Sequence, residues 1–134
     1  LYRGGYFFAC ISLCQAIAEA IVRLLCEKNN EKSPNFRKGI NTLKKLRKEI
    51  PEDWIRILQE IWKDRNNYHH LNPEVPTQKT KLEKIAKSKI GALFDVERMI
   101  FAFDLVGGTV KPKYPKYWNE PKNGMLNIFL TIEP

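Results

Sequence analysis

Six consecutive residues, Arg65-Asn66-Asn67-Tyr68-His69-His70, place a guanidinium, two amides and two imidazoles on little more than one helical turn. They include both histidines of the chain. The unperturbed pKa of imidazole, about 6.5, lies closer to neutrality than that of other side chains, so a histidine can exchange a proton at working pH. Arginine presents a fork of donors that matches phosphate oxygens. The motif therefore predicts chemistry on a phosphodiester.

On a helix that turns by about 100° per residue, four members of the motif fall within an arc of about 140°: Arg65, Asn66, His69 and His70. We expect these side chains on one side of the helix, with Tyr68 packing or capping elsewhere. A second explanation is electrostatic, because arginine and histidine also complement the negative carbonyl end of a helix dipole. The spacing by itself leaves both explanations open.

A helix expected from about Glu52 leads directly into the motif. Its inward residues are Trp54, Ile55, Leu58, Ile61 and Trp62, which recur at helical spacing. Asn72-Pro73 and Pro76 stop this helix, because the residue before a proline is disfavoured in helical geometry. We therefore expect the motif in the last turn of this helix or just beyond it.

Three more helices are expected from apolar residues at three- and four-residue steps. The first follows Gly4-Gly5, and the second runs from about Pro34 to Lys48 after Ser33, a residue that can cap a helix beginning with proline. The third of them runs from about Gln78 to Leu105 and is ended by Gly107-Gly108. Their inward residues are expected to be Phe7, Phe8, Ile11, Cys14, Ile17, Ala18, Ile21, Val22 and Leu25; Phe36, Ile40, Leu43 and Leu46; and Leu82, Ile85, Ile90, Leu93, Phe94, Val96, Met99, Ile100 and Phe103.

These patterns predict an all-α fold, a four- to five-helix up-and-down bundle with a C-terminal extended or β-like tail. The bundle is expected over residues 1–110, and residues 111–134 are expected as an extension packed on the bundle or on a partner protomer. Within the extension, residues 125–132 are apolar and β-prone. A strand there must pair with something, because a lone strand is not stable.

The formal net charge of +8 and the pI near 9.5 favour an anionic partner such as RNA, DNA or a membrane surface. The outer face of the second helix concentrates this charge, and Lys44, Lys45, Arg47 and Lys48 are the candidates for RNA contact. A run of this kind is also common on a solvated helix face.

Cys10, Cys14 and Cys26 are an odd number of cysteines without framework spacing, which favours a reducing compartment and hence the cytoplasm. We expect them to be small buried apolar residues, because thiols without nearby histidines or acids make a poor metal site. No metal or cofactor is expected. Polar and charged residues interrupt the apolar first helix, so we expect a core helix and no membrane partner. Because the sequence starts at Leu1, we also expect a trimmed or processed chain.

The order Arg65-Asn66-x-x-x-His70 resembles the Arg-polar-x-x-x-His signature of the HEPN superfamily, the small helical domains of prokaryotic toxins and RNA-targeting immunity proteins. That family has a four- or five-helix up-and-down bundle in which the motif ends a late-middle helix. Its long, alanine-rich first helix follows a glycine–aromatic entry, as Gly5-Tyr6-Phe7-Phe8-Ala9 does here. The resemblance covers roughly residues 4–105, and the tail has no counterpart in a minimal bundle of this family.

The resemblance implies a metal-independent endoribonuclease of a toxin or defence system, with its site at a dimer interface. Arg65 and His70 would be the catalytic pair and Asn66 the polar residue that orients them. An acidic residue on the first helix often accompanies the site in this family, and Glu19 or Glu27 fits. His69 is an alternative partner for His70 within one chain.

RNA supplies its own nucleophile, the 2′-hydroxyl, so histidine and arginine side chains can support cleavage without a metal. One histidine cannot easily act as acid and base at once, and a two-fold homodimer that brings two motifs face to face would supply both. The expected partners are therefore RNA, a second copy of the chain, and an antitoxin or larger effector as a regulator.

Two other functions stay open. Tyr114, Tyr117 and Trp118, interleaved with lysines, could hold single-stranded nucleic acid by stacking, or could pack on the bundle as a tail. The chain could also be a non-catalytic HEPN-like module that binds nucleic acid or serves in regulatory dimerisation.

Overall fold

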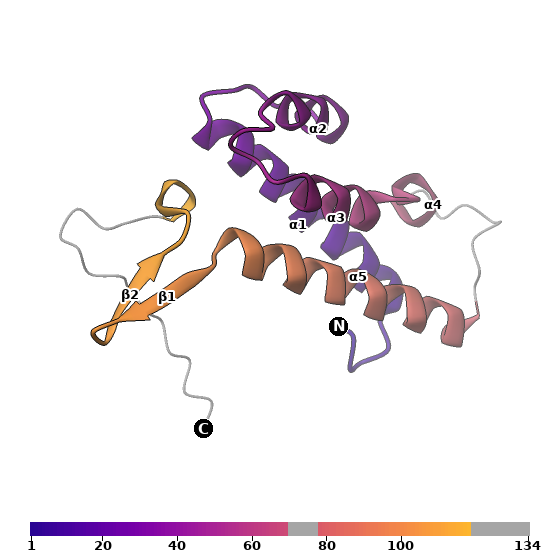
Figure 1. The fold of residues 1–134 in the computed structure, drawn as a ribbon. Coiled ribbons are helices and arrows are strands. Elements are labelled where there is room, and N and C mark those ends of the chain that lie inside the picture. Colours follow the sequence, from indigo (N-terminus) through magenta and orange to yellow (C-terminus); the bar gives the residue numbers. More distant parts are fainter. Residues whose placement is uncertain (70–77, 119–134) are drawn as a thin grey trace.

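The computed structural model describes residues 1–69 and 78–118, with only the backbone of His69. This part of the chain is mostly helical, with a two-stranded antiparallel sheet near its C-terminal end (Figure 1). The predicted helical fold with a β-like tail is thereby confirmed. The elements are α1 (Phe7–Lys28), α2 (Phe36–Lys45), α3 (Glu52–Trp62), α4 (Arg65–His69), α5 (Lys79–Ile100), β1 (Phe103–Val106), β2 (Thr109–Pro112) and the 3₁₀ helix η1 (Pro115–Tyr117).

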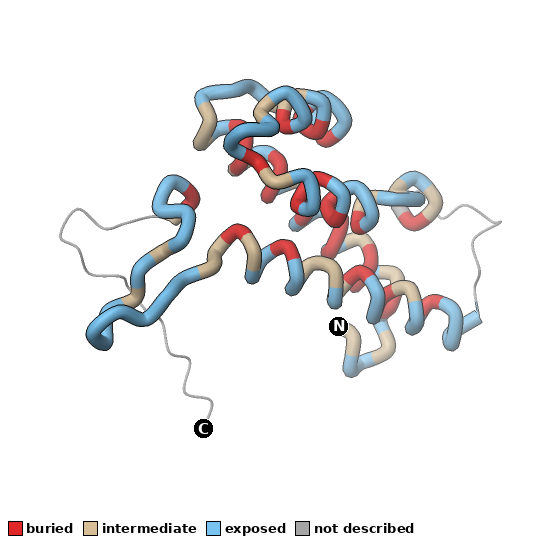
Figure 2. Tube along the Cα trace, viewed as in Figure 1, coloured by how far each residue is buried: buried red, intermediate tan, exposed pale blue. Residues whose placement is uncertain are grey.

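Helix α1 is the centre of the fold. It packs against α2, α3 and α5, and α3 also packs on α5, while the short α4 lies against α1 (Figure 1). Buried residues line the facing sides of these helices (Figure 2). Ile11, Val22, Leu25, Leu58 and Ile61 are fully enclosed. Burial of one such side chain contributes about 1.5 to 3 kcal/mol, so the apolar stripes seen in the sequence stabilise this arrangement.

The cysteines lie in this core as predicted: Cys10, Cys14 and Cys26 are buried and unpaired. Burial raises the pKa of the Cys14 thiol to about 11, so the thiol stays neutral and unreactive near pH 7. α1 has the length and apolar composition of a membrane-crossing helix, but here it packs among the other helices.

The predicted bounds of the second helix were too wide. α2 begins at Phe36, because the side chain of Asn35 accepts a hydrogen bond of 3.0 Å from the backbone N–H of Lys38 and thereby caps the helix. Ser33 lies further upstream and bonds the carbonyl of Asn35 at 3.3 Å. The helix ends at Lys45, so Lys48 lies beyond it.

The predicted fourth helix ends five residues early, at Ile100, and a hairpin follows. Gly107 and Gly108 have φ angles of 59° and 78°, the left-handed pair that a two-residue hairpin turn requires. They therefore join β1 to β2, and β2 crosses the expected domain boundary at residue 110. Phe103 was expected to face the core but lies in β1, where it is 50% exposed.

Two further inward predictions were wrong. Phe94 is 56% exposed on α5, and Ile17 is 37% exposed on α1. The apolar face of a long helix can be wider than the surface that the neighbouring helices cover. Periodicity in the sequence shows which side of the helix faces the core, but not how wide the contact is.

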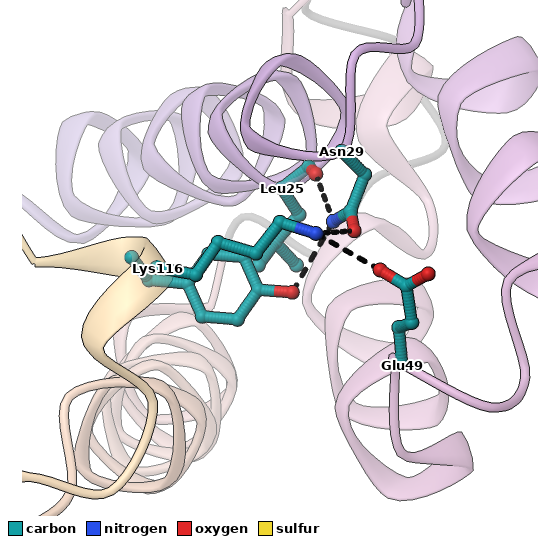
Figure 3. A network of polar contacts seen from close by, with 5 residues as sticks. Leu25, Asn29, Glu49 and Lys116 are labelled. Carbon is teal, nitrogen blue, oxygen red and sulfur yellow. Dashed lines mark hydrogen bonds and ion pairs between the residues drawn. The ribbon is translucent and has the colours of Figure 1, made fainter.

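The segment that follows the hairpin is anchored to the bundle by the network in Figure 3. Lys116 pairs with Glu49 at 2.9 Å and bonds the side-chain oxygen of Asn29. Asn29 donates to the carbonyl of Leu25 at 2.7 Å and to the hydroxyl of Tyr117 at 3.2 Å.

Aromatic packing adds to this anchor. The ring of Trp54 meets the rings of Tyr114 and Tyr117 edge-on, at 4.9 and 5.8 Å between centroids. Tyr117 is buried. Residues 113–118 therefore pack on the bundle, and the burial of Tyr117 removes one of the rings on which nucleic-acid bases were expected to stack. The strand expected at 125–132 lies outside the described residues.

Two helical glycines differ in the space around them: Gly39 lies where α2 packs closely on α1, and Gly91 lies on an open side of α5. A Cβ at Gly39 would collide with side-chain atoms of Val22 and Ser33, whereas a Cβ at Gly91 meets no atom within 4 Å. We expect Gly39→Ala to lower the free energy of unfolding by about 1 to 3 kcal/mol, because the helices must separate. Gly91→Ala should raise it by about 0.5 to 1 kcal/mol through helix propensity.

Urea unfolding of the two variants checks this pair. Stabilisation by both substitutions would contradict the α1–α2 packing described above.

Candidate functional site

A break in the chain separates the motif from the helix that was expected to carry it. α3 ends at Trp62, Asp64 takes the left-handed conformation with φ of 61°, and Arg65 begins α4. The helix expected from about Glu52 therefore does not continue into the motif, and the motif lies just beyond its end, in a short helix of its own. Aspartate is one of the few residues other than glycine that enter this conformation readily.

Lys89 of α5 explains where the break falls. Its buried ammonium group donates to the carbonyls of Ile61 at 2.7 Å, Lys63 at 3.1 Å and Glu60 at 3.4 Å. The side-chain amide of Gln15 donates to the same Lys63 carbonyl at 3.2 Å. The carbonyls that end α3 thus have partners from two other helices, and the chain can turn away after Trp62.

Two opposing effects act on the pKa of this ammonium group. Burial lowers the pKa of Lys89 below its ordinary value of 10.5, while the nearby carboxylate of Asp64 acts in the opposite direction. Lys89 also fills the role that the electrostatic explanation gave to Arg65, a cation at the carbonyl end of α3. Arg65 instead starts a helix, at the end where a cation is not favoured.

Aromatic rings hold Arg65 in place. Its guanidinium carbon lies 4.8 Å from the centroid of the Trp62 ring. That indole is stacked on Phe36 of α2, with centroids 4.1 Å apart and planes 7° from parallel. Tyr68 packs as expected: it is buried, with its ring 6.0 Å from that of Phe8. The Tyr68–Phe8 contact therefore packs α4 on α1, and the Arg65–Trp62 contact packs the first residue of α4 on the end of α3.

Arg65 opens on a hollow of about 370 Å³, which we call the Arg65 hollow. It is lined by Glu19, Asn35, Phe36, Arg37, Trp62 and Arg65. Glu19 holds Arg23 at 2.8 Å, and Asn35 caps α2. No described carboxylate lies within ion-pair distance of Arg37 or Arg65. Two cations without acidic partners suit the hollow to an anionic ligand.

The structure brings together two of the predicted site residues, Arg65 and Glu19, from α4 and α1. Asn66 is exposed on α4, and His69 is the last residue of that helix. His70 and the side chain of His69 lie outside the described residues. Their distances to Arg65 therefore stay predictions.

The predicted RNA-contacting residues lie elsewhere. Lys44 and Arg47 line a second hollow of about 630 Å³ between the end of α2 and α3, and Lys45 and Lys48 are exposed nearby in sequence. The two hollows share no lining residue.

Two residues were missed in the sequence. Lys89 lies among several surface lysines of the same helix, and its position seven residues after Leu82 and seven before Val96, on the apolar face, was the available signal for burial. Arg37 was left out because an exposed arginine has many explanations. Its place one residue after Phe36, at a predicted helix start, was the available signal.

Within residues 1–69 and 78–118, no three His, Cys, Asp or Glu side chains are grouped as a metal ion would require. Comparisons with protein-family models, with curated proteins and with solved structures found no match.

Loss of the Lys89 ammonium should destabilise the fold. In Lys89→Met, one buried and two partly buried carbonyls lose a donor, so we expect the free energy of unfolding to fall by about 2 to 3 kcal/mol. Lys87→Met, at an exposed position of the same helix, is the matched control and should change it by less than about 0.5 kcal/mol. Urea unfolding at neutral pH measures both, and equal effects would rule out this role for Lys89.

Proposed function

We propose that this protein is a metal-independent endoribonuclease of the HEPN type that cleaves single-stranded RNA, with its helices forming the up-and-down bundle of that family. One observation carries the proposal: Arg65, the first residue of the motif, faces an open hollow beside Glu19 instead of serving as a helix-end cation. A guanidinium in that position is available to a phosphate group.

The chemistry follows from the residue types. The 2′-oxygen of the substrate attacks phosphorus, the bond from phosphorus to the 5′-oxygen breaks, and a 2′,3′-cyclic phosphate forms. His70 takes the proton of the 2′-hydroxyl or protonates the leaving 5′-oxygen. Arg65 stabilises the charge that builds on the phosphoryl oxygens, and Asn66 orients the pair. His69 is the second candidate for the proton transfer that His70 does not perform.

A homodimer would supply the second histidine from another copy, and α1 carries a surface suited to it. Leu13 and Ile17 are exposed, and they continue a stripe of small exposed residues that we call the α1 stripe; its members are Ala9, Leu13, Ala16, Ile17 and Ala20. Their spacing is that of a helix pairing face with small residues that allow close approach. Glu19, which lines the Arg65 hollow, borders this stripe, so pairing along it would place the hollow next to the partner.

A second function is favoured by the hollow at Lys44 and Arg47. Its lining has three cations, Lys44, Arg47 and Arg56, against the two carboxylates of Glu52 and Asp53. This excess of positive charge supports a non-catalytic module that binds nucleic acid or regulates through dimerisation. On either account we propose a cytoplasmic protein of a toxin or defence system, controlled by an antitoxin or a larger effector. Growth arrest on expression that His70→Ala relieves would favour the enzyme.

Cleavage of labelled single-stranded RNA in excess EDTA tests the enzyme directly. We expect the native protein to leave 2′,3′-cyclic phosphate ends, and Arg65→Ala and His70→Ala to lower the rate by roughly 10²- to 10⁴-fold. Arg98→Ala, an exposed arginine of α5, should cleave at the native rate. Absence of cleavage by the folded native protein over many RNA sequences would favour the binding module.

The oligomeric state tests the α1 stripe. We expect a dimer by analytical ultracentrifugation, and a monomer for the double variant Leu13→Glu, Ile17→Glu, because four carboxylates would be buried in the paired helices. Phe94→Glu, at an exposed apolar position of α5, should stay dimeric. A native monomer at micromolar concentration would contradict the proposed dimer.

A further inference from the structure

The Arg65 hollow holds more positive charge than catalysis by one arginine requires. The carboxylate of Glu19 is already paired with Arg23, and the oxygen of Asn35 is bonded to the backbone of α2. Arg37 and Arg65 line the same hollow from two different elements, α2 and α4. A substrate with more than one negative charge fits this arrangement better than a single phosphate does.

Arg37 also begins an exposed polar face of α2. Arg37, Asn41 and Lys44 are four and three residues apart, so they lie on one side of the helix, and all are exposed. The neighbouring side of the helix is held in the core by Phe36 and Ile40. At 1.5 Å per residue, the face extends about 10 Å along the helix axis. It connects the Arg65 hollow at one end of α2 with the hollow lined by Lys44 at the other.

The aromatic residues of the hollow are engaged within the protein. Trp62 stacks on Phe36 and carries the Arg65 guanidinium, and Phe36 is only 5% exposed. Base stacking on these rings is therefore not available to a ligand, and the contacts that the hollow offers are to phosphate. Contacts of this kind position a strand without reading its bases.

From this arrangement we infer that Arg37 binds the phosphate next to the one held at Arg65, and that single-stranded RNA runs from the Arg65 hollow along α2 to Lys44. The inference rests on the proposed function, since it names the substrate path into that same site. Arg37 is a substrate-binding residue here and takes no part in proton transfer. Binding along this path depends on charge and not on base sequence.

Binding of an uncleavable RNA separates this path from catalysis. The probe is a short labelled oligoribonucleotide of mixed sequence in which every 2′-hydroxyl is methylated, so no nucleophile is present. We expect Arg37→Gln to weaken its binding by roughly 3- to 10-fold. The slope of the logarithm of the binding constant against the logarithm of salt concentration should become shallower by about 0.7, the value for one phosphate contact on a single strand. Lys44→Gln should have a similar effect.

The control is Arg98→Gln, which removes the same charge from an exposed site on α5 and should leave both quantities unchanged. Thermal melting of all variants verifies the fold, and Arg37 is exposed, so its variant should melt with the native protein. Native affinity in Arg37→Gln, equal losses in Arg37→Gln and Arg98→Gln, or absence of binding by the native protein would each overturn the inference.

The two proposals fail separately. Arg37-dependent binding without cleavage of ordinary RNA would leave the path in place and refute the nuclease. Cleavage at the native rate and affinity in Arg37→Gln would leave the nuclease in place and refute the path.

Discussion

The position of Arg65 depends on one buried cation that is not part of the motif. Lys89 reaches from α5 to the last carbonyls of α3 and satisfies groups that would otherwise require water or a further helical turn. With those carbonyls bonded, the chain leaves α3 at Trp62 and starts α4 at Arg65. A buried ammonium is costly, and only several good acceptors make it favourable. The start of the motif helix is therefore tied to the core and not to its own sequence.

Gln15 shows how tightly this corner is constrained. Its amide nitrogen serves the carbonyl of Lys63, while its buried side-chain oxygen has no partner among the described residues. An unsatisfied buried oxygen costs about 1 to 3 kcal/mol, so native structures rarely contain one. Here the cost accompanies the bond that helps to end α3.

Periodicity in the sequence was enough to predict the helices and most of the core, because burial of apolar stripes follows from local spacing. It was not enough to place the break before Arg65, since the break depends on a lysine 24 positions later in the chain. The end of α5 was missed for a related reason: Gly107-Gly108 can stop a helix or turn a hairpin, and pairing of β1 with β2 decides between them. Arg65 was predicted from its residue type and its place in the motif, and Glu19 was one of two acidic residues that a family resemblance offered. That both line one hollow could be seen only in the fold.

Positive charges have two different roles in this protein, and the net charge of the sequence does not distinguish them. One buried cation, Lys89, donates hydrogen bonds to the backbone carbonyls at the end of α3, and these carbonyls offset its charge. Arg37 and Arg65 line a hollow, and no described carboxylate lies within ion-pair distance of either of them. Because water and salt screen exposed charges, the net charge alone says little about binding. The feature that suits an anion here is a pair of cations without acidic partners, one of which, Arg65, lies over the ring of Trp62.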